Sequence, residues 1–425
     1  MKRRNRLLLF TLIFTLIFST TAFAAVTPNP LDLIGKAAIS VDMDTNEIIY
    51  TKNIDNKVYP ASTTKLITAL LLAENKSSTD NLVYTQNAKN QPPYSYNLNV
   101  HPVAIGDTMS ADNVMDGLLL YSGNDIAYMI ADNVGGDPNK VGGNADNFAK
   151  MMNDEAAKLG MKGSHFITPN GLDDLNDQHY TTAYDLTLAG RAAFKNDWVR
   201  QSMGKKSSEI KSTNGPVATV ENRNKLLGID GCIGGKTGLT TKAGRCLVAI
   251  YERNGRHIIG VVMNSENDAK DTKVFEDMQK LIDFSYAAKK EVLNKKDTAI
   301  NTISVPYKVI PFIGPERTIN IPLESKEDVT FYNNDVKPLT SIKTDGINPW
   351  KLSKDTSVGT LDFKQRDASK SYKLYPMISK STLIKDNVII YAAAAIILIV
   401  VLALIILLIS SINKRRNRRG RGMRF

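Results

Sequence analysis

The sequence predicts an α/β protein in which helices pack on one antiparallel sheet, followed by a small all-β domain and one transmembrane helix. Three observations predict this. Strand–turn–strand patterns stand far apart, at 37–52 and 245–264, with mostly helical patterns between them. Short alternating stretches with Pro and Gly punctuation fill residues from about 300 to 380. A run without any charged residue covers 388–412.

Each hairpin pattern is centred on turn residues. The first turns at Asp44-Thr45-Asn46 and the second at Asn254-Gly255, a dipeptide typical of two-residue hairpin loops. Apolar periodicity predicts a helix after the second hairpin, at about 270–292, and four between the hairpins, at 64–74, 111–133, 145–159 and 182–195. We therefore expect distant parts of the chain to close one sheet.

Both ends of the chain carry targeting signals. Basic residues, an apolar run and Ala22-Phe23-Ala24 are typical of a secretory signal peptide that is cleaved after Ala24. As a helix, 388–412 would be about 37 Å long, enough to cross a hydrocarbon core of about 30 Å. The basic tail after it should stay in the cytoplasm. We expect a single-pass membrane protein whose residues from about 25 to 387 lie outside the cell.

The formal net charge of +11 is explained by these two ends. The signal segment carries four basic residues and the tail seven, neither with an acidic residue, so the rest of the chain is neutral. The basic character therefore indicates topology, and no nucleic-acid partner is expected.

Cysteine and histidine give no sign of a disulfide framework or a metal site. Cys232 and Cys246 flank a likely hairpin turn without falling opposite each other, so a bridge is not expected. The four histidines are scattered without metal-ligand spacing, so neither a catalytic metal nor another cofactor is expected.

Ser62 and Lys65 lie at the start of an apolar helical segment. Their i, i+3 spacing places both on one helical face. Desolvation at the edge of a buried segment should lower the pKa of Lys65, and a neutral amine beside a hydroxyl is a base beside a nucleophile. Taken alone, this stretch also fits a Ser/Thr N-cap with a solvated lysine.

Two further motifs follow. Ser122-Gly123-Asn124 falls in a loop between apolar helical runs, and Lys236-Thr237-Gly238 falls on a strand leading into the second hairpin. Each motif alone is weak evidence for a catalytic site, since a turn would explain the first and a solvated lysine the second. Together with Ser62-x-x-Lys65, and in this order, they form the S-x-x-K, S-x-N and K-T-G signature of penicillin-binding proteins and serine β-lactamases.

The chain resembles the low-molecular-mass penicillin-binding proteins that act as serine D-Ala-D-Ala carboxypeptidases. The resemblance covers nearly all of the chain and is carried by the blocks at 60–71, 118–127, 168–193 and 234–249. It implies a central antiparallel sheet with helices on both sides, peptidoglycan stem peptides as substrates and β-lactam antibiotics as inhibitors. His179, Tyr180 and Asp185 match one block, but we interpret them as structural.

The catalytic roles follow from residue chemistry. Ser62 would be the nucleophile, Lys65 its base, and Ser122 the relay that carries a proton to the leaving amine. A second cation, Lys236, would help to keep Lys65 neutral. The family implies an oxyanion hole from the backbone N–H groups of Ser62 and Leu239.

The remaining motif residues would bind the substrate. Asn124 offers an amide to the substrate backbone. Lys236 and Thr237 suit a carboxylate, one by charge and the other by its hydroxyl. Gly238 has no side chain, so a substrate strand can lie against this strand edge.

The resemblance also predicts the organisation of the chain. The expected parts are a signal peptide (1–24), a catalytic domain (25–295), a β-rich C-terminal domain (296–380), a transmembrane helix (388–412) and a basic cytoplasmic tail (413–425). The β-rich domain shows no catalytic constellation and is expected to act as a spacer or docking module.

Three alternatives stay open. A class A β-lactamase shares two of the motifs but usually has S-D-N in place of S-G-N, and no E-x-x-x-N stretch that would suit deacylation follows Asn124. A D,D-endopeptidase uses the same chemistry on cross-links. A non-catalytic wall-binding scaffold would not need every chemical position to be occupied.

Overall fold

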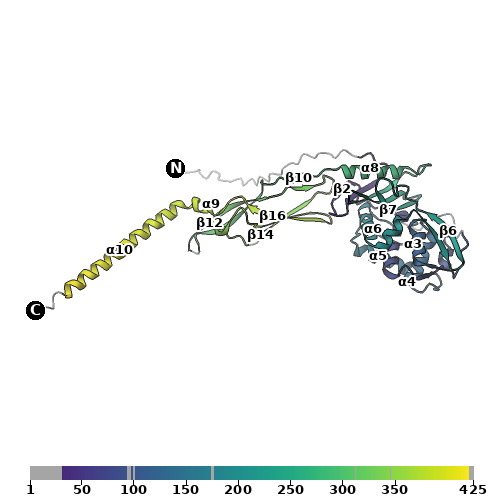
Figure 1. Cartoon of the computed structure of the whole chain (residues 1–425), viewed down its shortest axis with the longest axis horizontal. Coiled ribbons are helices and arrows are strands. Elements are labelled where there is room, and N and C mark those ends of the chain that lie inside the picture. The colour runs from purple at the N-terminus through teal and green to yellow at the C-terminus, as the bar shows by residue number, and fades with distance from the viewer. Residues whose placement is uncertain are drawn as a thin grey trace, which may run out of the picture. The chain divides into compact units, whose positions relative to one another are not determined.

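Figure 1 shows the computed structural model of the chain, which describes residues 31–92, 97–98, 101–173, 177–311, 313–344 and 346–420. The expected signal peptide, 1–24, and the end of the basic tail, 421–425, lie outside these described residues.

The principal sheet has five antiparallel strands in the order β2-β1-β9-β8-β7. Its strands are β1 (Ala37–Asp42), β2 (Ile48–Lys52), β7 (Cys232–Thr240), β8 (Gly244–Arg253) and β9 (Arg256–Ser265). Both predicted hairpins are confirmed. β1 pairs with β9, with Ala37 opposite Met263, so distant parts of the chain close the sheet as expected.

The segment between the hairpins is mainly helical. It contains η1 (Ala61–Thr64), α1 (Lys65–Asn75), α2 (Gln86–Lys89), α3 (Ala111–Leu119), α4 (Asn124–Gly135), α5 (Ala145–Lys158), α6 (Ala183–Lys195) and α7 (Asp197–Gly204). The long pattern at 111–133 is therefore two helices, α3 and α4, separated by the loop that carries Ser122. This break turns the chain so that the loop faces the principal sheet's last strand.

Several short elements were not predicted. Among them are α7 and the strand pairs β3 (Asn81–Val83) with β4 (Thr108–Ser110) and β5 (Ser207–Ser212) with β6 (Gly215–Glu221). The helix α7 begins directly after α6, because the Asn196 side chain accepts a hydrogen bond from Val199 N and caps the new helix. The strand pairs are short and largely polar, so they lack the apolar alternation that predicts strands.

Helices cover both faces of the principal sheet, as the family resemblance implied. Neighbouring positions of a strand point to opposite faces. Ile259 lies against Gly190 of α6, whereas a Cβ at the next position, Gly260, would meet Met278 of α8 (Lys273–Ala287). The helix predicted at about 270–292 is thus confirmed in shorter form, since β10 (Glu291–Asn294) follows it.

A second five-stranded antiparallel sheet follows, in the order β11-β12-β16-β15-β14. Its strands are β11 (Ala299–Ile310), β12 (Ile313–Ser325), β14 (Leu339–Thr344), β15 (Gly359–Gln365) and β16 (Ala368–Pro376); β10 pairs separately with β13 (Val329–Phe331), and η3 (Pro349–Lys351) precedes β15. Leu323, Phe363 and Leu374 belong to an apolar cluster of its own, which fits the predicted all-β region.

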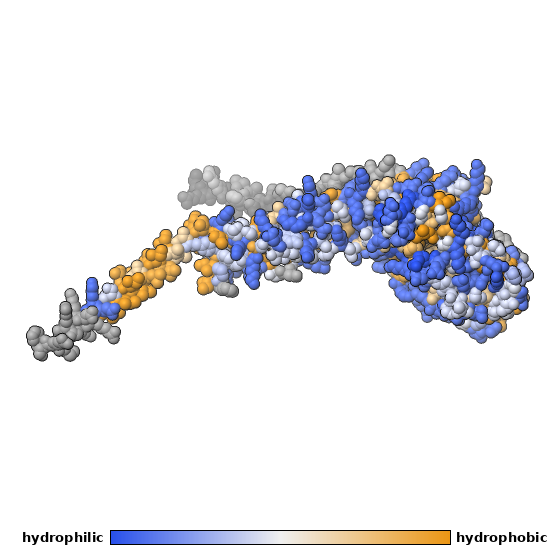
Figure 2. Space-filling view, viewed as in Figure 1, coloured by the Kyte–Doolittle hydropathy of each residue, from blue (hydrophilic) through white to orange (hydrophobic). Residues whose placement is uncertain are grey.

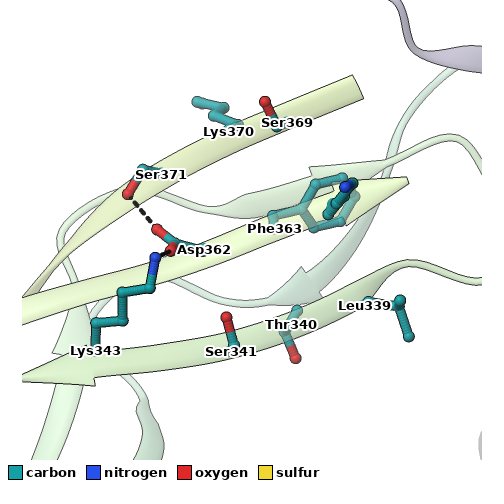
Figure 3. A pocket seen from close by; sticks show the side chains of 10 residues that line it. Leu339, Thr340, Ser341, Lys343, Asp362, Phe363, Ser369, Lys370 and Ser371 are labelled. Carbon is teal, nitrogen blue, oxygen red and sulfur yellow. Dashed lines mark hydrogen bonds and ion pairs between the residues drawn. The ribbon is translucent and has the colours of Figure 1, made fainter. Parts of the chain in front are cut away.

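The face of β14, β15 and β16 carries a shallow hollow of about 750 Å³ (Figure 3). Asp362 stands in it, bonded to Lys343 Nζ at 2.7 Å and to Ser371 Oγ at 2.7 Å. These groups satisfy one another, and none belongs to the three sequence motifs. The hollow therefore offers no catalytic constellation.

The C-terminal segment forms α9 (Lys380–Asp386) and α10 (Val388–Gly420). Leu383 is buried in the apolar cluster of the second sheet, and Asn387 Nδ2 donates to Tyr307 Oη at 2.7 Å. Residues up to 387 thus pack with that sheet. Within α10, Val388–Arg415 is long and apolar enough to span a membrane, and Figure 2 shows most of this helix as hydrophobic, with hydrophilic residues at its C-terminal end. Cys232 and Cys246 are both free and buried.

Candidate active site

Ser62 lies on the 3₁₀ turn η1, directly before α1. Its hydroxyl accepts a hydrogen bond from Lys65 Nζ at 2.8 Å. Neither η1 nor α1 has a side-chain cap bond at its N-terminus. The N-cap interpretation of this stretch is therefore wrong, and Ser62 is free to take part in chemistry.

Lys65 is fully buried and has three hydrogen-bond partners. Besides Ser62 Oγ, its amine donates to Asn124 Oδ1 at 2.7 Å and to the backbone oxygen of Asn170 at 2.9 Å. The last two oxygens can only accept, so they take two N–H groups of the amine. In the neutral amine, the lone pair must then face Ser62 Oγ, which is the direction that a base requires.

The electrostatic surroundings favour the neutral form of Lys65. Its pKa lies well below the usual value because of burial, and the positive charge of Lys236 lowers it further, while Asp125 opposes both effects. Neither Lys65 nor Lys236 forms a salt bridge with a carboxylate in the described part of the chain. A fully buried lysine without such a partner is rare in proteins.

Lys236 and Ser122 form a second lysine–serine pair. Lys236 Nζ donates to Ser122 Oγ at 2.9 Å and to the backbone oxygen of Thr237 at 3.0 Å. Burial lowers the pKa of Lys236 to about 7, with a further contribution from the charge of Arg223. Arg223 in turn donates to the backbone oxygen of Tyr121, the neighbour of Ser122, at 2.9 Å.

Two non-glycine residues at the site have positive φ angles. Ala61, beside the first serine, has φ 47°, and Ser122 has φ 68°. The left-handed region costs a residue with a Cβ about 1–2 kcal/mol. Such strain is typical of functional sites, where the surrounding structure holds a side chain in one direction.

The strand β7 stands at the end of the principal sheet and carries the third motif. Gly238 lets it approach η1, because a Cβ at this position would lie 3.0 Å from Ala61 Cβ and 3.1 Å from Ser62 N. Any side chain there would push β7 and the first serine apart. The predicted oxyanion donors, Ser62 N and Leu239 N, belong to these two closely packed segments.

The structure joins the motif residues in two hydrogen-bonded groups rather than in one continuous network. Ser62, Lys65 and Asn124 form one group, and Ser122 with Lys236 forms the other. In the described residues, no hydrogen bond links Ser122 to Lys65. Thr237 follows Lys236 on β7, and its hydroxyl makes no hydrogen bond to either pair.

Sequence reasoning gave no role to the loop at 168–172. This loop is fastened to α1, because Thr68 Oγ1 donates to the backbone oxygen of Pro169 at 2.6 Å and Lys65 to that of Asn170. Gly171 has φ 86° and lies against Ala61. The Thr-Pro-Asn-Gly sequence signals a turn, but only the fold shows that the turn reaches Lys65.

His179 supports the same region, in agreement with its structural interpretation. Its Nδ1 accepts from Ile167 N at 3.1 Å, so Nε2 carries the proton and donates to Thr64 Oγ1 at 2.9 Å. Burial lowers the pKa of His179 to about 3, so the ring is neutral near pH 7. Asp185 accepts from Gly163 N at 2.7 Å and is structural as well.

The solved structures that resemble this chain define the class of its fold. A mutant of the Streptomyces K15 DD-transpeptidase matches with a TM-score of 0.56 and 27% identity, covering 60% of this chain and 98% of that one. Penicillin-binding protein D2 from Listeria monocytogenes, in its cefotaxime-bound form, matches with a TM-score of 0.53 and 28% identity, covering 61% of this chain and 100% of that one. The fold is therefore that of the penicillin-binding proteins.

Sequence comparison gives the family. The model of the D-alanyl-D-alanine carboxypeptidase family matches residues 24–267. The D-alanyl-D-alanine carboxypeptidase DacF of Bacillus subtilis is 26% identical over 83% of this chain and 88% of its own length. The chain belongs to the D-alanyl-D-alanine carboxypeptidase family, whose members are serine peptidases.

Proposed function

We propose that this carboxypeptidase removes the terminal D-Ala from peptidoglycan stem pentapeptides through an acyl-enzyme at Ser62. The single observation that carries the proposal is the pair of buried lysines, Lys65 and Lys236, each hydrogen-bonded to a serine and neither paired with a carboxylate of the described residues. Two buried cations near each other are costly unless one is neutral, and a neutral lysine is a base.

In the acylation step, Lys65 takes the proton of Ser62, and Ser62 Oγ attacks the carbonyl carbon of the penultimate D-Ala. The fixed direction of the Lys65 lone pair supports this role, since Asn124 and Asn170 occupy its N–H groups. The negative charge on the carbonyl oxygen would be stabilised by the N–H groups of Ser62 and Leu239. One such donor is typically worth about 3–4 kcal/mol.

The leaving D-Ala must gain a proton on its nitrogen and carries a free carboxylate. Ser122 would give its own proton to that nitrogen and then take the former Ser62 proton from Lys65, which leaves the Lys65 amine neutral again. Lys236 with Thr237 would hold the carboxylate. The hydrogen bond between Lys236 and Ser122 supports this division, because a cation lowers the cost of losing the hydroxyl proton. Asn124 and the free edge of β7 would hold the substrate backbone, as an added strand is held at a sheet edge.

β-Lactam antibiotics would acylate the same serine. They present an amide and a carboxylate in the arrangement of D-Ala-D-Ala, and the related Listeria protein was solved in a cefotaxime-bound form. Ring opening leaves the amine attached, so it cannot diffuse away as D-Ala does. A long-lived acyl-enzyme is the expected result.

We further propose that the chain is anchored by α10, with the signal peptide 1–24 removed and the catalytic and β-rich parts, from about 25 to 387, outside the cell. The apolar length of α10 supports anchoring, and the basic residues after it support a cytoplasmic tail. Protease added to intact cells should digest the catalytic domain and leave a tag on the tail intact. Digestion of the tail instead would reverse the proposed orientation.

The decisive experiment uses mass spectrometry of a stem pentapeptide incubated with the protein. Loss of one alanine distinguishes the carboxypeptidase from an endopeptidase, which would open cross-linked dimers, and from a scaffold, which would do neither. Ser62→Ala should lose both this activity and labelling by a fluorescent penicillin, while its Tm stays within a few degrees of the wild type. Labelling that persists in Ser62→Ala would place the nucleophile elsewhere.

A further inference from the structure

The side chain of Asn170 contains a buried donor that the protein does not use. Its Oδ1 accepts a hydrogen bond from Leu172 N at 3.1 Å. Because Leu172 N–H is a donor, the atom that faces it must be the oxygen, and this fixes the orientation of the amide. The other end, Nδ2, is buried and has no hydrogen-bond partner in the described part of the chain.

A buried N–H group without a partner normally costs about 1–3 kcal/mol, so its retention calls for an explanation. Its position suggests one. The backbone oxygen of Asn170 bonds to Lys65 Nζ at 2.9 Å, and covalent geometry keeps Nδ2 within about 5 Å of that oxygen. The unused donor therefore lies within about 8 Å of Lys65 Nζ, the proposed base.

The proposed reaction has one reactant with no assigned binding group, namely the water that hydrolyses the acyl-enzyme. Once Ser62 Oγ is an ester, it has no proton to give, so the Lys65 lone pair becomes available to another donor. The other two partners of Lys65, Asn124 Oδ1 and the Asn170 backbone oxygen, keep the amine in place. A water that donates to Lys65 can accept a hydrogen bond from a neighbouring N–H group.

We propose that Asn170 Nδ2 binds and orients the water that hydrolyses the acyl-enzyme. The water oxygen attacks the ester carbonyl carbon while one of its protons passes to Lys65 Nζ. The bond between that carbon and Ser62 Oγ then breaks, and Lys65 returns the proton to Ser62. The acid product and the free enzyme account for all atoms, and no other reactant is required. This inference rests on the proposed function.

The turn geometry supports a dedicated role. Thr168 Oγ1 accepts from Gly171 N at 3.2 Å, and the Asn170–Leu172 bond closes the same turn. The amide is thus held by its oxygen end, with its nitrogen end left for a ligand. In the described residues, three other buried side-chain atoms form no hydrogen bond, but two of them, Arg245 Nε and Asp271 Oδ1, form an ion pair with each other at 2.7 Å; the third is Tyr251 Oη.

The test measures how the acyl-enzyme divides between two acceptors. An acylated D-Ala-D-Ala peptide is incubated with the protein and isotopically labelled D-Ala. Hydrolysis releases the shortened acid, whereas exchange returns a peptide with labelled D-Ala. Labelled D-Ala would be bound by Lys236 and Thr237, independently of Asn170. Asn170→Leu should therefore raise the ratio of exchange to hydrolysis by about three- to tenfold, as expected for one lost hydrogen bond.

The matched control is Thr168→Val, which removes a bond of the same turn and leaves Nδ2 in place. It should slow hydrolysis and exchange alike and leave their ratio unchanged. If Asn170→Leu does not fold, Asn170→Ser keeps an oxygen for Leu172 N with a side chain too short to reach the position of Nδ2, and the same rise in ratio is expected.

Two outcomes would overturn the inference separately from the proposed function. If the wild type catalyses both reactions and Asn170→Leu leaves their ratio unchanged, Asn170 does not hold the water. If Thr168→Val raises the ratio as much as Asn170→Leu, the effect belongs to the turn. If the wild type catalyses neither reaction, the proposed function fails, and this inference fails with it.

Discussion

The replacement of Gly171 by alanine tests whether the loop at 168–172 orients the base. A Cβ at Gly171 would lie 1.9 Å from the backbone oxygen of Ala61, so the loop must retreat by roughly 1 Å or more to reach an ordinary contact. The hydrogen bond from Lys65 to Asn170 O is 2.9 Å long, and the same shift would carry it past the length of a hydrogen bond. The Lys65 lone pair would then lose its fixed direction.

The expected result is a slower acylation of Ser62. A misplacement of about 1 Å at a reacting group can cost about 100-fold, and one lost hydrogen bond alone costs about three- to tenfold. We therefore expect Gly171→Ala to reduce the rate of labelling by a fluorescent penicillin about 10- to 100-fold. The rate is measured by stopped-flow fluorescence at several penicillin concentrations, so that binding and acylation are separated.

Gly160→Ala provides the matched control. Gly160 has φ 82°, close to the 86° of Gly171, but a Cβ there would meet nothing within 4 Å. Both variants carry the cost of a left-handed alanine, about 1–2 kcal/mol, and both should lower the Tm by several degrees. Only Gly171→Ala should slow acylation. Equal acylation rates in the two variants would refute the role of the loop.

Three further predictions follow from the same geometry. Amidation of the C-terminus of the peptide should lower kcat/KM about 10- to 100-fold at pH 6, as expected for a lost charge-assisted contact. Because the pKa of Lys236 is about 7, the difference in kcat/KM between the acid and the amide should shrink as pH rises through 7 and the cation is lost. A difference that is the same at pH 6 and pH 8 would remove Lys236 from carboxylate binding. The pKa of His179 is about 3 when folded and about 6.5 when unfolded, so the unfolded state binds more protons between these values and stability falls as pH falls. Thermal unfolding should show that the free energy of unfolding falls by about 2 kcal/mol from pH 7 to pH 5 in the wild type but not in His179→Gln. The same dependence of this free energy on pH in both proteins would contradict the prediction. A chain that ends at Asn387 should be soluble and active. A chain that ends at Ser379 should have a lower Tm, because it lacks the buried Leu383 and the Asn387–Tyr307 hydrogen bond. Equal Tm values for the two chains would show that α9 is dispensable for stability.

The sequence by itself determined the two sheets, most helices and the identity of the motif residues. Hairpin turns such as Asn254-Gly255 require local backbone angles that few residues adopt, and both of these residues have positive φ in the structure. The apolar run of α10 is set by composition alone. Features of this kind depend on near neighbours in the chain, so a pattern can predict them. The sequence predicted the break between α3 and α4 within 111–133 less clearly, because Lys236 and Arg223, which are distant in sequence, hold the loop at Ser122.

Only the tertiary structure decided how the motif residues are joined. The sequence predicted a proton relay at Ser122 but not its partners; the fold pairs Ser122 with Lys236 and places Asn124 on Lys65. The third partner of Lys65 is a backbone oxygen of Asn170, and a backbone oxygen carries no residue signal. Burial decided the protonation of Lys65, because the pKa of a lysine depends on how far water is excluded and on which charges lie near it in space. One of these charges, on Lys236, lies 171 positions away in the sequence.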